Sequence, residues 1–104
     1  MRFLITSTPR FPIPPELAAT LLSAMNDWVK RYTASKKIEQ IWGFVSGGGG
    51  GVLTVASHEE LNAILSEMPF TPFAETRVEP LIPIEVGLNN FKQAMARMTQ
   101  PVSR

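Results

Sequence analysis

The chain contains no cysteine and only one histidine, His58. Without cysteine it can form no disulfide bond and offers no thiolate for nucleophilic catalysis or zinc binding. A single histidine also excludes a metal site that needs several histidines from one chain. The sequence therefore predicts no metal site.

Long apolar runs and concentrated charge are missing as well. No segment approaches the ~18 consecutive apolar residues that suggest a membrane span. The N-terminal run of apolar residues is soon followed by Pro9 and Pro12, so it lacks the core of a signal peptide. The net charge is only +1 and the lysines and arginines are scattered, which argues against a nucleic-acid-binding surface. We expect a cytoplasmic protein that binds neither membranes nor nucleic acid.

What the chain does contain is enough apolar sequence for one domain. Its 104 residues are 44% hydrophobic and 18% charged, and a chain of this length buries roughly two-thirds of its unfolded surface. The low charged fraction indicates that part of the apolar surface is covered by a partner, most simply a second copy of the chain.

Residue periodicity predicts an alternating order of strands and helices. Alternating or apolar segments predict strands, and apolar residues at helical spacing predict helices. The predicted strands are 2–7, 38–46, 52–56 and 76–84, and the predicted helices are 16–33, 58–68 and 86–98. The order strand, helix, strand, strand, helix, strand is that of the ferredoxin-like α+β fold, followed here by a C-terminal helix.

This order places both crossover helices on one face of a four-stranded sheet. The other face would carry some of the apolar residues Phe3, Ile5, Trp42, Phe44, Leu53 and Val55. Burying that face against a second copy predicts a homodimer, or a higher homo-oligomer, built as a dimeric α+β barrel. We assign residues 1–85 to the domain and 86–104 to a helical tail.

Five consecutive glycines, Gly47–Gly51, stand between the two middle strands. A phosphate-binding loop would continue into Gly-Lys-Ser/Thr and a helix, whereas this run leads into a strand. We interpret the glycines as the loop of an antiparallel hairpin.

Two prolines shape the segment that follows the second helix. Pro69 and Pro72 force the preceding residues out of the helical region. They place Phe70 and Phe73 on a stiff, non-helical joint. This joint is either a corner of the core or the wall of a pocket.

The first helix carries the one candidate acid–base residue, Asp27. Asp27 and Arg31 are four residues apart and can form a surface ion pair. The alternative is that Asp27 lies at the rim of a cleft between helix and sheet and accepts a proton.

Several segments resemble the muconolactone isomerase family, whose members are small cofactor-free proteins with the dimeric α+β barrel. The matching segments are Ile41–Trp42, the run from His58 to Phe73, and the run from Thr76 to Leu81. The resemblance implies a proton shift that moves a double bond in a small lactone, without a cofactor. Asp27 would be the catalytic base, while Trp42, Phe70 and Phe73 would form the substrate pocket and Arg31 would bind substrate charge.

The chain also departs from the family at positions that are polar in other members. Leu4 stands where a histidine is common, Gly43 where an arginine follows the tryptophan, and Phe73 where a tyrosine is found. Three functions follow as hypotheses. The first is an isomerase acting on a small lactone or enolisable acid. The second is a small-molecule binder or scaffold that has lost the chemistry, and the third is a cofactor-free oxygenase whose site includes Trp28, Trp42 and Asn26.

Overall fold

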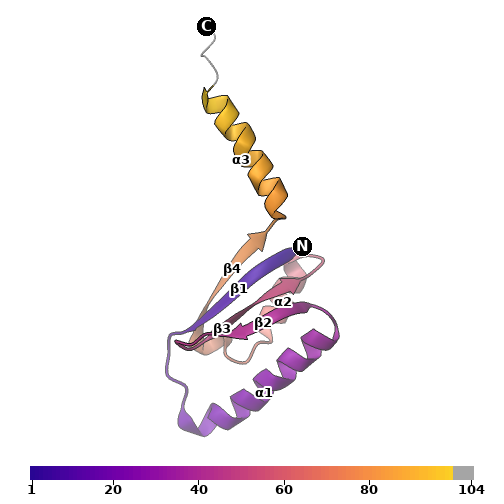
Figure 1. Ribbon diagram of the computed structural model, residues 1–104. Coiled ribbons are helices and arrows are strands. Elements are labelled where there is room, and N and C mark those ends of the chain that lie inside the picture. Colours follow the sequence, from indigo (N-terminus) through magenta and orange to yellow (C-terminus); the bar gives the residue numbers. More distant parts are fainter. Residues whose placement is uncertain (100–104) are drawn as a thin grey trace.

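The structure of the protein is a computed structural model that describes residues 1–99. Within these residues, four strands form one sheet in the order β2-β3-β1-β4, with every neighbouring pair antiparallel (Figure 1). The strands are β1 (Arg2–Pro9), β2 (Ile38–Gly43), β3 (Gly49–Thr54) and β4 (Ala74–Leu81). The helices are α1 (Pro15–Ala34), α2 (His58–Ser66) and α3 (Ile84–Thr99), with a short 3₁₀ helix at Thr71–Phe73. The predicted ferredoxin-like order is confirmed.

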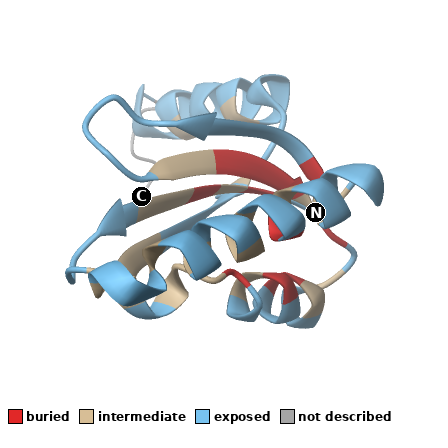
Figure 2. Cartoon of the chain, turned by 90° about the horizontal axis from the view of Figure 1, so that it is seen from below, coloured by how far each residue is buried: buried red, intermediate tan, exposed pale blue. Residues whose placement is uncertain are grey.

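Helices α1 and α2 cover the same face of the sheet, which we call the inner face. Trp28 of α1 and Ile64 of α2 share one apolar cluster with Phe3 and Leu53 of the sheet, and all four side chains are buried. Figure 2 shows the buried residues concentrated where the helices approach the strands. The core therefore lies between the sheet and its two crossover helices.

Local sequence signals fix where α2 begins. The Ser57 side chain accepts a hydrogen bond from the backbone N–H of Glu60 at 3.1 Å, as expected of an N-cap. The Glu60 carboxylate accepts a hydrogen bond from the backbone N–H of Ala56 at 2.9 Å and one from Lys37 at 3.0 Å. His58 is the first helical residue, and its ring lies edge-on to Phe3.

The prolines of β4 are accommodated because β4 is an edge strand. Pro80 pairs with Phe3 of β1, and its missing N–H leaves no gap in a further ladder because β4 has one neighbour only within the described sheet. Strand β1, apolar on both faces, lies in the interior of the sheet between β3 and β4.

The interpretation of Gly47–Gly51 as a loop is wrong for three of the five glycines. Residues Gly49–Gly51 belong to β3 and pair with β1 on one side and β2 on the other. The hairpin turn lies earlier, where the backbone N–H of Phe44 donates to the carbonyl of Gly48 and the N–H of Gly47 donates to the carbonyl of Phe44, both at 3.0 Å. Glycine has the same backbone donor and acceptor as any other residue, so it can continue a ladder even though it gives up side-chain packing.

The opposite face of the sheet, which we call the outer face, is less apolar than predicted. Phe3, Ile5, Leu53 and Val55 are all buried in the core cluster, because the strand register turns them towards α1 and α2. Of the predicted set, Trp42 does lie on the outer face, because it alternates with the inward-facing Ile41 and Gly43 on β2. The face is otherwise mixed and includes the Arg2–Glu39 ion pair with a closest distance of 2.7 Å. The dimeric barrel stays a prediction.

Helix α3 projects away from the rest of the protein (Figure 1). None of its described residues is buried, and the molecule extends 69 Å along its longest axis but only 29 and 24 Å along the others. The predicted tail helix at 86–98 is confirmed with slightly wider bounds, while residues 100–104 of the predicted tail lie outside the described residues. In the described part of the chain, no helix combines the length and apolarity needed to cross a membrane.

Candidate functional site

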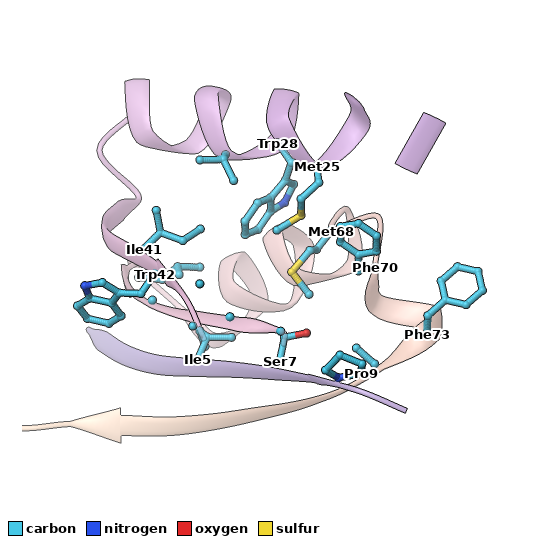
Figure 3. Close-up of a pocket in the computed structure, with 18 of the residues that line it drawn as sticks. Ile5, Ser7, Pro9, Met25, Trp28, Ile41, Trp42, Met68, Phe70 and Phe73 are labelled. Atoms are coloured by element: carbon cyan, nitrogen blue, oxygen red, sulfur yellow. The ribbon is translucent and has the colours of Figure 1, made fainter. Parts of the chain in front are cut away.

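A cavity of about 520 Å³ lies between α1 and the inner face of the sheet. Residues from β1, α1, the β2–β3 hairpin and the Met68–Phe73 joint enclose it (Figure 3). The lining is Ile5, Ser7, Pro9, Phe11, Ile13, Met25, Trp28, Val29, Ile41, Trp42, Gly43, Gly48, Gly49, Gly50, Gly51, Leu53, Met68, Phe70, Phe73 and Ala74. A volume of this size suits a small organic molecule.

Side-chain size along the strands explains why the cavity lies at one end of the sheet. Residues paired across β2, β3 and β1 form successive rows on the inner face. From one end to the other, the rows are Ile38–Leu53–Phe3, Ile41–Gly51–Ile5 and Gly43–Gly49–Ser7. Large side chains fill the first row, which we call the packed end. The last row, which we call the open end, has only one hydroxymethyl group to fill the same space.

The backbone geometry of the hairpin requires glycine at several of these positions. A Cβ added to Gly51 would stand 2.5 Å from the carbonyl oxygen of Gln40, closer than any ordinary contact. Gly48 has a positive φ of 79°, and a Cβ there would stand 2.2 Å from the carbonyl oxygen of Ser7. Gly43 differs, because a Cβ there meets no atom within 4 Å. The glycine run therefore permits the close hairpin and leaves the cavity floor bare.

The Met68–Phe73 joint forms a wall of the cavity, and this decides between the two alternatives left by the sequence. Phe70 and Phe73 both line the cavity, and both are half-buried. The Thr71 hydroxyl donates to the carbonyl of Leu65 at 3.0 Å, which fastens the joint to the end of α2. The carbonyl of Phe73 also accepts hydrogen bonds from the backbone N–H groups of Arg10 and Phe11 at 3.0 and 3.1 Å.

The two tryptophans have different positions. The Trp28 side chain is only 3% exposed, and its indole N–H donates to the carbonyl of Ile64 at 3.0 Å. It therefore joins α1 to α2 as part of the scaffold. Trp42 also belongs to the lining, but it stands between the inward-facing Ile41 and Gly43 on β2. Its ring therefore points away from α1 (Figure 3) and is 46% exposed.

The lining contains no ionisable side chain among the described residues. Besides the two indoles, its side-chain polar group is the hydroxyl of Ser7. Thr76 pairs with Ser7 across β1 and β4, and its hydroxyl oxygen is buried without a hydrogen-bond partner in the described structure. Thr76 itself does not belong to the cavity lining, so Ser7 is the hydroxyl that a ligand at the open end can reach.

Asp27 and Arg31 lie apart from the cavity residues. Both are exposed on α1, and neither belongs to the lining formed by the described residues. Arg31 pairs with Glu67 and not, as the sequence had suggested it could, with Asp27. Its Nη1 lies 3.2 Å from Glu67 Oε2, and Glu67 also accepts a hydrogen bond from the Tyr32 hydroxyl. That hydrogen bond raises the pKa of Tyr32 above its usual value.

Of the five residues predicted for the site, Trp42, Phe70 and Phe73 lie together around the cavity. The prediction missed Ser7 and the glycines of β3, which form the open end. A signal for them existed in the decreasing side-chain size from Phe3 to Ser7 and from Leu53 to Gly49. Reading it required the register of the two strands.

An ion pair flanks the open end and was also missed. Arg10 pairs with Glu75, and Arg77 approaches the same carboxylate at 3.4 Å. The hydrogen bond from Arg10 lowers the pKa of the Glu75 carboxyl below its usual value. Within the described residues, no group of three or more metal-ligating side chains comes together.

The fold of the chain is shared with solved structures. It matches the crystal structure of muconolactone isomerase with a TM-score of 0.73 at 22% sequence identity, covering 80% of this chain and 90% of that one. It also matches 5-chloro-2-hydroxyhydroquinone dehydrochlorinase from Burkholderia phenoliruptrix, solved in complex with 2,5-dihydroxybenzoquinone. That match has a TM-score of 0.63 at 23% identity and covers 79% of this chain and 94% of the other.

Sequence comparison identifies the family. No curated protein matches the chain, but the profile described as muconolactone delta-isomerase matches residues 1–84. These residues include every strand of the sheet and both crossover helices, as well as the whole cavity lining. The chain belongs to the muconolactone delta-isomerase family.

Proposed function

We propose that the chain binds a small, largely apolar ring compound in the cavity between α1 and the sheet. The observation that carries this proposal is the lining itself: about 520 Å³ enclosed by aromatic and aliphatic side chains over a glycine floor. Such a cavity favours a flat, largely apolar ring, and any charged substituent of the ligand should point out of the cavity, since inside it the charge would lose its hydration without gaining an ionic partner. The hydroxyl of Ser7 would bind a carbonyl or hydroxyl group at the open end.

Two relatives support a ring compound of this size. The family name refers to a lactone, and the dehydrochlorinase structure holds 2,5-dihydroxybenzoquinone. Both compounds are small oxygenated rings, and both can serve as probes for this chain.

Family membership favours a second candidate, a cofactor-free proton shift that moves a double bond in a small lactone or enolisable acid. Asp27 is the base predicted from the sequence, and Arg31 the cation for substrate charge. Asp27 is adjacent in sequence to Trp28, which lines the cavity, but its carboxylate is exposed. The candidate therefore needs a ligand that extends from the cavity towards the surface of α1. We also propose, from the sequence, a cytoplasmic location and assembly as a dimeric α+β barrel.

The binding proposal is tested by filling the cavity. In Gly43→Leu the new side chain starts from a position where a Cβ meets no atom within 4 Å, on the row that faces the cavity. We expect calorimetric titration with muconolactone and with 2,5-dihydroxybenzoquinone to show at least tenfold weaker binding than in the unmodified chain. The matched control is Gln40→Leu, which adds the same side chain to β2 at an exposed position outside the lining. Equal affinity in Gly43→Leu and Gln40→Leu would contradict the proposal.

The catalytic candidate is tested separately. Solvent deuterium incorporation into muconolactone should be abolished by Asp27→Asn and retained by Glu59→Gln, which changes an exposed carboxylate on α2. If Asp27→Asn keeps the full exchange rate, Asp27 is not the base. If the unmodified chain binds the lactone without any exchange, the chain is a binder.

A further inference from the structure

Helix α3 carries an apolar stripe that none of the other described residues of its chain covers. Leu88 is 61% exposed and Phe91 is 65% exposed, and no described residue of the helix is buried. The helix has 16 residues, a length at which an isolated helix in water is only marginally stable. Its stability therefore depends on a surface that packs against this stripe.

The stripe has the spacing of a coiled-coil seam. Its residues follow one another at intervals of four, three, four and three, as in the a and d positions of a heptad repeat. The stripe consists of Ile84, Leu88, Phe91, Met95 and Met98. A seam of this kind fits into the matching seam of another helix, and the strict alternation of the intervals favours a helical partner.

The connection to β4 keeps α3 away from its own domain. Only Ile82 and Pro83 separate the strand from the helix. The carbonyl of Pro83 accepts hydrogen bonds from the backbone N–H groups of Val86 and Gly87 at 3.1 and 3.3 Å, so the first turn forms directly after the strand. Since proline fixes its own backbone, this short connection leaves little freedom for α3 to fold back onto the sheet.

The charges beside the seam select a second copy as the partner and an antiparallel arrangement. Glu85 and Lys92 each follow a seam residue by one position, so both lie on the same edge of the stripe. Two antiparallel copies bring this edge of one helix against the same edge of the other, and Glu85 of each copy then meets Lys92 of the other. A parallel pair would instead place this edge opposite Gly87 and Ala94, where no charge pair forms.

We propose that α3 is a self-association helix, whose Ile84–Met98 stripe packs antiparallel against the same stripe of a second copy, with Leu88 facing Phe91 of the partner subunit. The interface is self-complementary, as a two-fold dimer contact must be. Apart from Ile84, it lies outside the part of the chain that matches the family, which ends at residue 84. The interface is thus an addition to the family domain and does not depend on the function proposed for the cavity.

Cysteine cross-linking tests the arrangement directly, because the chain has no cysteine of its own. Leu88→Cys and Phe91→Cys are prepared as separate full-length variants, mixed under reducing conditions and then oxidised. The antiparallel seam predicts that the disulfide-linked product of the mixture consists mainly of one Leu88→Cys chain joined to one Phe91→Cys chain, as identified by mass spectrometry. Asn90→Cys, exposed on another side of α3, should give no such product.

The cross-linking can also overturn the proposal. In a parallel pair, Leu88 would face Leu88 and Phe91 would face Phe91. Each variant would then form disulfide-linked dimers on its own, and the mixture would give no excess of the mixed product. A helix that packs on something other than α3 would give no specific linked product.

Sedimentation tests the seam and the charges. Leu88→Glu should halve the mass of the assembly, while Asn90→Glu should leave it unchanged. Glu85→Lys should weaken association several-fold, and the double variant Glu85→Lys/Lys92→Glu should restore it, because the charge pair is re-formed with its signs exchanged. An unchanged mass in Leu88→Glu, or a double variant no better than Glu85→Lys, would contradict the proposal.

Discussion

The packed end and the open end of the inner face are built on the same three strands, yet one is core and the other is cavity. At the packed end, Phe3 and Leu53 are 4% and 2% exposed and fill the space below α2. Two rows further along the same strands, Ser7 and Gly49 leave most of that space empty. The ladder continues through both ends, so the difference lies in side-chain volume and not in the backbone. A cavity can thus arise where a regular sheet carries only glycine and other small residues on one face.

The largest expected effect comes from truncating one large side chain at each end. Leu53→Ala should lower the free energy of unfolding by about 2–5 kcal/mol, the usual cost of a buried leucine. Phe70→Ala should cost less than half as much, because Phe70 is half-buried beside an existing cavity. Urea unfolding of the two variants measures both values. Equal losses would mean that the two ends are equally well packed.

The next comparison concerns two glycines of the hairpin that both line the cavity. Gly51→Ala should destabilise the protein by about 1–3 kcal/mol, as overpacking generally does, because the added Cβ would stand 2.5 Å from the Gln40 carbonyl oxygen. Gly43→Ala should change stability by no more than about 0.5 kcal/mol, as for a surface substitution, because its Cβ meets nothing within 4 Å. Thermal unfolding compares the pair. A greater loss in Gly43→Ala would show that the close contact at Gly51 relaxes readily.

The smallest effect should appear in acid, where each end carries a carboxylate with a lowered pKa. At the packed end, the hydrogen bond from the Ala56 backbone and then that from Lys37 lower the pKa of Glu60 below its ordinary value of 4.5. At the open end, Arg10 does the same for Glu75. A group whose pKa is lower in the folded state stabilises the protein above its ordinary pKa, and this contribution is lost as the pH falls through the folded value.

Stability should therefore decrease as the pH falls below about 4.5, the ordinary glutamate pKa. Glu60→Gln and Glu75→Gln should each make this decrease smaller. Urea midpoints measured across this pH range test the prediction. Unfolding curves of Glu60→Gln that keep the full pH dependence would remove Glu60 as a source of acid sensitivity.

Much of the fold could be predicted from the sequence because its local signals agree. Ser57 and Glu60 mark the start of α2, Pro69 and Pro72 end it and build the joint, and helical spacing defines α1 and α3. The Phe70 and Phe73 rings could be predicted as a possible pocket wall for the same reason. These features depend on residues that are close together in the chain.

The features of the fold and site that could not be predicted depend on contacts between residues far apart in the sequence. Glycine has a low strand propensity, so nothing local indicated that Gly49–Gly51 would continue β3 between two other strands. The partner of Arg31 is Glu67, 36 residues away in sequence, and helical spacing cannot reveal it. The sequence could say only that some of a set including Phe3, Ile5 and Leu53 would lie on the outer face, and these three lie in the core. Both faces of their strands carry apolar residues, and only the packing of α1 and α2 chooses between them.

The bare floor of β3 also has a thermodynamic consequence. A ligand in the cavity would occupy the volume that side chains fill at the packed end, and it would contact only the folded state. By mass action, its binding adds to the stability of the domain in proportion to the logarithm of its concentration. Ligand concentration would then determine how much of the protein remains folded, and the missing part of the core would be supplied by the small molecule itself.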